Sequence, residues 1–237
     1  MKIVGSGLLG KAFEDSGLSE VFDGYVVIAS GVSNSKETSS EAFEREISLV
    51  RHECVLARKQ ERKVVYISTY SIRENMSGSK MYVEAKLFCE NIVFAASENN
   101  IVIRLTNVIG HGGNSNNILN FLFHKVVENE PLIIYRGVKR NFVDVEDVPR
   151  FLEHSLKTFP DKRLLHLVHP FSYRIEHLVE AISEFTGKPA RVERFDTLPN
   201  NDFRSSEESD SFFTDVYSDG IYSIKELLEK YYMGSRG

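Results

Sequence analysis

Short, almost uninterrupted apolar runs alternate with segments of helical periodicity in this chain, and this alternation constrains its fold more than any other feature. The apolar runs predict strands at residues 2–5, 25–30, 64–68 and 101–105. The periodic segments predict helices at 8–16, from the capping-box sequence Thr38-Ser-Ser-Glu41 to Lys59, and at 80–96. Strands that are apolar on both sides belong to parallel sheets covered on both faces. The sequence therefore predicts an α/β fold with a parallel sheet.

The second half of the chain has a different character, which predicts a small cap packed on the sheet. The expected elements are a loop at 110–117, a helix at 118–128, strands at 132–135 and 164–168, a helix beginning at 144–147, a helix at 174–186, a strand at 190–195, a loop at 196–220 and a helix at 223–232. We assign the sheet domain to residues 1–108 with parts of 130–170, and the cap to 109–129 and 171–237.

Composition argues against several classes of protein. The formal net charge is -5 over 237 residues, and the basic residues are scattered, so no nucleic-acid surface is predicted. No apolar run approaches the roughly 20 residues of a membrane span, and the amino terminus reads as a strand rather than a signal peptide. Cys54 and Cys89 lack Cys-x-x-Cys spacing, so neither a disulfide framework nor a metal site is predicted. We expect a reduced, cytoplasmic protein with no membrane partner.

A glycine-rich turn joins the first strand to the first helix. The sequence Gly5-Ser6-Gly7-Leu8-Leu9-Gly10 stands where backbone N–H groups can approach a pyrophosphate at a helix amino terminus. A tight turn with close helix packing is the alternative use of the same glycines. The strand before the turn and the helix after it favour the phosphate site, because that context is the test of the motif.

Tyr82 and Lys86 lie four residues apart inside a predicted helix, so their side chains share one face. A nearby ammonium favours the phenolate form of a tyrosine, which can then exchange a proton with a hydroxyl group near neutral pH. Thr69, at the end of the preceding strand, can hold the same oxygen. A surface tyrosine beside a solvated lysine is the alternative. A second copy of the spacing, Tyr135 with Lys139, falls in a strand and turn and is attributed to chance.

The order of these segments resembles the extended short-chain dehydrogenase/reductase family, which includes NAD-dependent epimerases, dehydratases and 4-keto reductases of nucleotide sugars. The resemblance runs through most of the chain. Its further matching segments are Ile28-Ala29-Ser30, Tyr66-Ile-Ser-Thr69, Arg104-Leu-Thr-Asn107-Val-Ile-Gly110, Asn116-Asn117-Ile-Leu, and Leu132-Ile-Ile-Tyr followed by Arg140-Asn-Phe-Val-Asp-Val-Glu-Asp-Val148. A Rossmann-like parallel sheet with a small substrate-binding cap is the fold that the resemblance implies.

The resemblance also implies a set of roles. Catalysis would fall to Thr69, Tyr82 and Lys86, and a nucleotide-sugar substrate would meet Asn107, Asn117 and Arg140. NAD or NADP would lie against Gly5, Gly7, Leu8, Leu9, Gly10, Ala29, Ser30, Tyr82 and Lys86. The implied reaction is reduction or epimerisation at C4 of a keto-sugar, for surface polysaccharide synthesis. Pairing of family members through the helices corresponding to 40–59 and 80–96 implies a homodimer.

The chain departs from the family pattern near its amino terminus. Only residues 11–24, fourteen in all, separate Gly10 from Tyr25, which leaves room for one helix and no further strand-helix-strand unit. The sheet should therefore be truncated at one edge, with no acid or arginine to choose NAD over NADP. A direct connection would be a left-handed crossover, so residues 19–22 are expected to form a vestigial strand. The glycine spacing also departs from the family's usual pattern.

Two other functions remain open. The truncated edge motivates a non-catalytic relative that binds a dinucleotide or sugar nucleotide as a sensor or partner subunit. Retention of Thr69, Tyr82 and Lys86 together favours an enzyme, since a binding module has no need of that set. A reductase of another small carbonyl compound is disfavoured by the residues matched to sugar-nucleotide binding. The acidic run Glu207-Glu-Ser-Asp210 is expected to be solvated.

Overall fold

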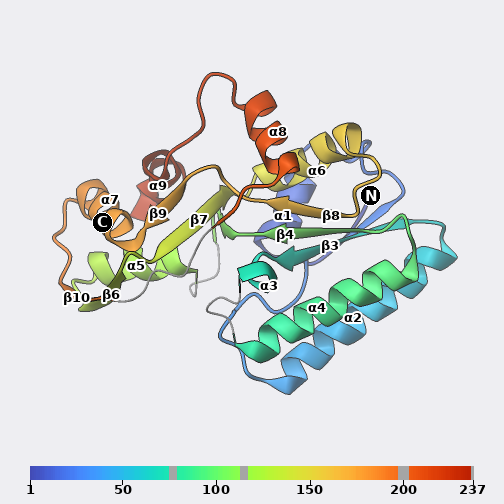
Figure 1. The fold of residues 1–237 in the computed structure, drawn as a ribbon, viewed down its shortest axis with the longest axis horizontal. Helices are drawn as coiled ribbons and strands as arrows, with labels where there is room; N and C mark the ends of the chain where they lie inside the picture. Colours follow the sequence, from blue (N-terminus) through green and yellow to red (C-terminus); the bar gives the residue numbers. More distant parts are fainter. Residues whose placement is uncertain (75–78, 113–116, 197–202, 236–237) are drawn as a thin grey trace.

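A five-stranded parallel sheet forms the centre of the protein in a computed structural model that describes residues 1–74, 79–112, 117–196 and 203–235 (Figure 1). Its strands, in spatial order, are β1 (Lys2–Val4), β2 (Tyr25–Ile28), β3 (Lys63–Thr69), β4 (Ile101–Leu105) and β8 (Leu164–Leu167). The predicted α/β fold with a parallel sheet is confirmed. β1 is the edge strand, as the truncation predicts.

Two layers of helices cover the sheet. The helices α2 (Ser40–Lys59) and α4 (Lys80–Ala96) lie side by side on one face, and α1 (Leu8–Asp15) and α6 (Asp147–Thr158) cover the other (Figure 1). Successive strand residues point to opposite faces, so Val26 packs under α2 and α4 while Val27 packs under α1 and α6. Both faces of these strands are apolar for this reason.

The crossover through α1 has the opposite hand to the two crossovers that follow it. The connections β1–α1–β2 and β2–α2–β3 move in the same direction across the sheet, but their helices lie on opposite faces. The expectation that residues 19–22 preserve the usual hand by forming a strand was wrong, because they form turns. Phe22 is fully buried there, with its ring 5.8 Å from that of Phe13. Apolar packing of the turn therefore replaces strand pairing.

A second hydrophobic core lies beside the sheet (Figure 1, left). It is built from α5 (Ile118–Val127), α7 (Ile175–Thr186) and α9 (Ile224–Tyr232). Two small sheets join it, β6 (Leu132–Arg136) with β10 (Val192–Asp196), and β5 (Asn107–Ile109), β7 (Lys139–Asp144) and β9 (Ser172–Arg174). The chain also forms the short helix α3 (Ser71–Glu74) and a 3₁₀ turn at Met233–Ser235.

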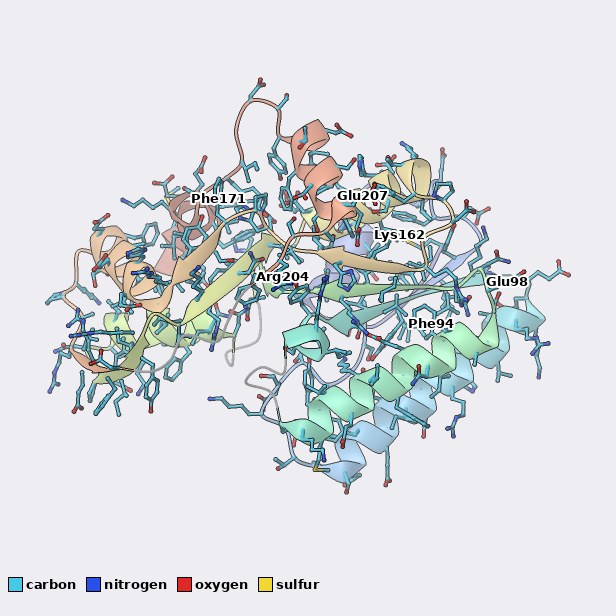
Figure 2. All side chains as sticks on the ribbon, viewed as in Figure 1. Phe94, Glu98, Lys162, Phe171, Arg204 and Glu207 are labelled. Carbon is cyan, nitrogen blue, oxygen red and sulfur yellow. The ribbon has the colours of Figure 1, made fainter. Side chains whose placement is uncertain are left out.

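The prediction of a loop at 196–220 was wrong for part of this range, because α8 (Glu207–Val216) forms there. Ser206 caps this helix, and Phe212 and Phe213 return to the core of the sheet. Glu208 is fully buried and accepts hydrogen bonds from Lys162 and from the backbone N–H of His166, so the acidic run is only partly solvated. Glu207 lies near Lys162 at the start of this helix (Figure 2), and its Oε2 is 3.8 Å from Lys162 Nζ. The side chain of Glu207 is exposed.

The predicted capping box at the start of α2 is also corrected. Ser39 is the cap, and its hydroxyl accepts a hydrogen bond from Ala42 N–H at 3.3 Å. Glu37 in turn accepts from the backbone N–H groups of Thr38 and Ser39. No helix in the described part of the chain is long and apolar enough to cross a membrane.

Candidate active site

A cavity of about 480 Å³ opens where the central strands end. Its walls come from the segments that follow β1, β2, β3 and β4, with contributions from α4 and the cap. The carboxyl ends of parallel strands are where α/β proteins bind ligands. Ten of the predicted site residues line this cavity: Gly7, Leu8, Leu9, Ala29, Thr69, Tyr82, Lys86, Asn107, Asn117 and Arg140. Gly5, Gly10 and Ser30 do not.

The three glycines of the first turn serve different purposes. Gly5 has φ +126°, and a side chain there would meet the carbonyl oxygen of Ala29 at 2.7 Å. A side chain at Gly10 would meet the carbonyl oxygen of Gly5 at 2.0 Å. Gly7, which caps α1 without a side-chain hydrogen bond, has open space around it on the cavity wall. Gly5 and Gly10 therefore let the chain pack closely, and Gly7 leaves room for an anion at the helix amino terminus.

We expect Gly10→Ala to destabilise the fold by about 2–3 kcal/mol, because the added methyl group would overlap the Gly5 carbonyl group in a tightly packed turn. Urea unfolding of this variant and of Gly7→Ala would measure the difference. Gly7→Ala is the matched control, because its methyl group meets no atom within 4 Å. Equal stability of the two variants would contradict this account of the turn.

Helix α4 places Tyr82 and Lys86 together on the cavity wall. Ser79 caps this helix and accepts a hydrogen bond from Tyr82 N–H at 3.1 Å. Both side chains are buried, and the ammonium of Lys86 lies 5.8 Å from the centre of the Tyr82 ring. The prediction that the two share one helix face is therefore confirmed. The alternative of a surface tyrosine beside a solvated lysine does not fit this burial.

Lys86 also has a partner that the sequence analysis missed. Its ammonium donates to the carboxylate of Glu46 on α2 at 2.6 Å. Burial alone would lower the pKa of Lys86, but Glu46 and then Tyr82 raise it above its usual value. A sequence signal exists in retrospect, because Glu46 interrupts the apolar stripe of α2 between Phe43 and Val50.

Thr69 and Ser68 point to different surroundings at the end of β3. The Thr69 hydroxyl oxygen accepts a hydrogen bond from Ser71 N–H at 3.2 Å, which leaves its own hydrogen to donate. The Ser68 hydroxyl donates at 2.6 Å to Glu90, which also pairs with Arg104 through two hydrogen bonds. Thr69 is therefore the better placed of the two to bind a ligand oxygen.

The residues predicted to bind substrate reach the cavity from β5, β7 and the start of α5. Asn107 donates to the carbonyl oxygen of Asn141 at 2.9 Å, and Arg140 donates to that of Lys139 at 2.9 Å. Asn117 caps α5 and donates to the carbonyl oxygen of Val108, so its amide has a structural task as well. Asn116, its predicted companion, lies outside the described residues.

Phe203 and Tyr70 form a further part of the cavity wall. Phe203 lines it and stacks on Tyr70, with ring centres 6.0 Å apart, and the Tyr70 hydroxyl donates to the carbonyl oxygen of Arg204. Phe203, which precedes α8, therefore forms part of the wall, which the sequence did not predict. Tyr135, the second tyrosine with Tyr-x-x-x-Lys spacing, lies on β6, is 53% exposed and does not line the cavity.

Among the described residues, no cluster of three or more potential metal ligands occurs.

Comparison with solved structures supports the fold. UDP-N-acetylglucosamine 4-epimerase from Bacillus cereus is similar with a TM-score of 0.70 at 16% identity, over 100% of this chain and 97% of that one. UDP-glucuronic acid 4-epimerase from Bacillus cereus, in complex with NAD, gives 0.68 at 16% identity, over 93% and 77%. RMD from Pseudomonas aeruginosa, complexed with NADPH, gives 0.67 at 15% identity, over 97% and 98%. None of the curated proteins is significantly similar to this chain in sequence.

Sequence comparison identifies the family directly. The profile described as the NAD dependent epimerase/dehydratase family matches residues 3–164, which include β1 to β4 and the cavity residues that they carry. The family resemblance noted in the sequence is confirmed. The chain therefore belongs to the NAD dependent epimerase/dehydratase family.

Proposed function

We propose that this protein binds NAD or NADP in the cavity and catalyses reduction or epimerisation at C4 of a nucleotide keto-sugar. The single observation that carries the proposal is that one cavity gathers the open amino terminus of α1 at Gly7 together with Thr69, Tyr82 and Lys86. A helix amino terminus suits a pyrophosphate, and the hydroxyl and ammonium groups suit proton transfer. Solved structures of similar fold include MoeE5 in complex with UDP-glucuronic acid and NAD.

The residues of the first turn fit a dinucleotide. Gly7 leaves open space beside the backbone N–H groups of Leu8 and Leu9, and all three line the cavity. These groups would hold the pyrophosphate, since the first N–H groups of a helix lack partners within the helix. The bound nicotinamide would supply the hydride acceptor or donor. NAD or NADP therefore fits this site.

The remaining chemistry falls to side chains of this chain. The Tyr82 hydroxyl would exchange a proton with the oxygen at C4 of the sugar, and the Thr69 hydroxyl would hold that oxygen by a hydrogen bond. Lys86 would keep a positive charge beside Tyr82 and donate hydrogen bonds to the cofactor. Asn107, Asn117 and Arg140 would bind the sugar nucleotide, with the Arg140 guanidinium suited to a diphosphate. The product would serve surface polysaccharide synthesis.

A non-catalytic binding protein is the second candidate, and the position of β1 at the edge of the sheet favours it. In a doubly wound dinucleotide site, the strand after the glycine-rich helix reads the adenosine ribose. Here the next strand along the chain, β2, lies between β1 and β3, and among the described residues no strand lies beyond β1 in that position. The residues that follow β2, Ala29 to Val32, are uncharged. The adenosine part of a bound dinucleotide would therefore have fewer specific contacts with the protein, whereas Thr69, Tyr82 and Lys86 are present on the cavity wall.

A sugar-nucleotide assay separates the two candidates. The purified protein would be incubated with NAD and UDP-glucose, UDP-N-acetylglucosamine or UDP-glucuronic acid, with epimers detected by NMR. It would also be incubated with NADPH or NADH and a 4-keto deoxysugar nucleotide, with oxidation followed by absorbance. Turnover in either arm supports the enzyme. Binding of the cofactor without turnover of any of these compounds would favour the non-catalytic candidate.

A further inference from the structure

Glu46 is a buried carboxylate that lies behind the cavity wall. It projects from α2, it is 4% exposed, and it is not among the residues that line the cavity. Its Oε1 accepts hydrogen bonds from Lys86 Nζ at 2.6 Å and from the Tyr66 hydroxyl at 2.8 Å. Its Oε2 accepts from Val32 N–H at 2.9 Å. One side chain thus joins α4, β3 and the segment after β2.

Within the part of the chain that the structure describes, the charge of Glu46 has no substitute near Lys86. A buried ammonium without a counter-ion tends to lose its proton. The other titratable groups that face Lys86 are Tyr66 on β3 and Tyr82 and Cys89 on its own helix. Burial raises the pKa of Cys89 to about 11, and burial followed by the charge of Glu46 raises that of Tyr66 well above its usual value. Both groups are therefore neutral at physiological pH, and Glu46 supplies the negative charge.

The same carboxylate also fixes part of the cavity wall. Gly31 and Val32 line the cavity, and Val32 N–H is held by Glu46. At Gly31 the backbone lies so close that a side chain would meet Glu46 Oε1 at 2.2 Å. The position of Lys86 and the position of this segment are therefore set by one group.

We propose that Glu46 is a positioning residue of this active site, which keeps Lys86 as an ammonium directed at the cavity and fixes the wall at residues 31–32. Where the proposal concerns the cofactor, it rests on the proposed function. It does not depend on that function for the protonation of Lys86, which can be measured in the free protein. A carboxylate that only held α2 against the sheet would stabilise the fold without controlling that proton.

The test compares Glu46→Gln with Glu90→Gln. Gln keeps the shape of the side chain and removes its charge. Glu90 is the matched control, because it is 1% exposed and pairs with Arg104, which stays charged in proteins. The proton of Lys86 would be followed by NMR of ¹³C- and ¹⁵N-labelled lysine in the free protein, with Lys86→Arg used for assignment. Binding of NADH would be measured between about pH 7 and about pH 9.

We expect Lys86 to lose its proton at lower pH in Glu46→Gln than in the wild type, and Glu90→Gln to leave that midpoint unchanged. The dissociation constant of NADH should rise by about tenfold or more with pH in Glu46→Gln and by less than about threefold in the other two proteins. An unchanged Lys86 midpoint in folded Glu46→Gln would overturn the proposal. If that variant does not fold, the same measurement on the wild type provides the test. Loss of the Lys86 proton at a lower pH than loss of the proton of the exposed Lys80 would overturn the proposal. A shifted midpoint without NADH binding in any protein would support the positioning of Lys86 and count against the proposed function.

Discussion

Tyr82→Phe is expected to lower kcat by about 10³-fold or more while leaving the affinity for NADH within about twofold, since general acid–base catalysis contributes on this scale. The change removes one oxygen from a buried side chain on the cavity wall and keeps the ring that packs beside Lys86. Steady-state kinetics with the sugar nucleotide found to be turned over would measure kcat. Calorimetric titration would measure the binding of NADH.

The chain provides its own control for this variant. Tyr135→Phe removes a hydroxyl group from the other tyrosine with Tyr-x-x-x-Lys spacing, which lies on β6 away from the cavity. It should leave kcat unchanged. Full activity in Tyr82→Phe would remove Tyr82 from the mechanism, and equal losses in both variants would indicate a general effect on the fold.

Glu208→Gln is expected to lower the free energy of unfolding by about 2–3 kcal/mol, the scale of hydrogen bonds to a charged group. Glu208 is fully buried where α8 packs on β8, and it accepts a hydrogen bond from the backbone N–H of His166 at 2.8 Å and another from Lys162. Urea unfolding at neutral pH would measure the loss. Glu207→Gln is the matched control, since its side chain is 78% exposed and the expected loss is below about 0.5 kcal/mol.

The contribution of Glu208 should depend on pH in a defined direction. Burial raises the pKa of this carboxyl, but hydrogen bonds from His166 and Lys162 outweigh burial and lower it from 4.5 to about 2. A carboxyl whose pKa is lower in the folded state stabilises the fold above its unfolded value of 4.5 and loses this effect as the pH falls towards 2. The difference between wild type and Glu208→Gln should therefore shrink between about pH 5 and about pH 2. A difference that is constant over this range would contradict the assignment.

The parts of the fold that the sequence predicted share a physical cause. The central strands are short apolar runs, and α4 begins directly after its capping residue Ser79, so its predicted bounds of 80–96 match the structure. In contrast, α8 has few apolar residues and begins with acidic ones. It is stabilised by long-range contacts, including the docking of Glu208 on the edge strand β8. Periodicity cannot reveal such contacts.

The candidate site likewise contains features that depend on local spacing and features that depend on long-range contacts. Motif spacing predicted that Tyr82 and Lys86 share a helix face, because that relation is local. The pairing of Lys86 with Glu46 joins residues 40 positions apart, and the wall residue Phe203 reaches the cavity from the segment before α8. The turns at residues 19–22 likewise depend on the packing of Phe22 in the core. Each of these features is set by tertiary packing rather than by neighbouring residues.

Calorimetric titration of NADH and NADPH into the wild type and Gly7→Asp tests the central claim most directly. Aspartate at position 7 would meet no atom within 4 Å at its Cβ and is a favourable helix cap, but its charge would repel a pyrophosphate. Asn99→Asp, exposed before β4, controls for the added charge. We expect NADH and NADPH to bind the wild type with dissociation constants within about tenfold of each other, and Asn99→Asp to bind them as the wild type does. Folded Gly7→Asp should bind each nucleotide about 100-fold more weakly than the wild type. No binding of either nucleotide to folded wild type, or unchanged binding in Gly7→Asp, would contradict the account.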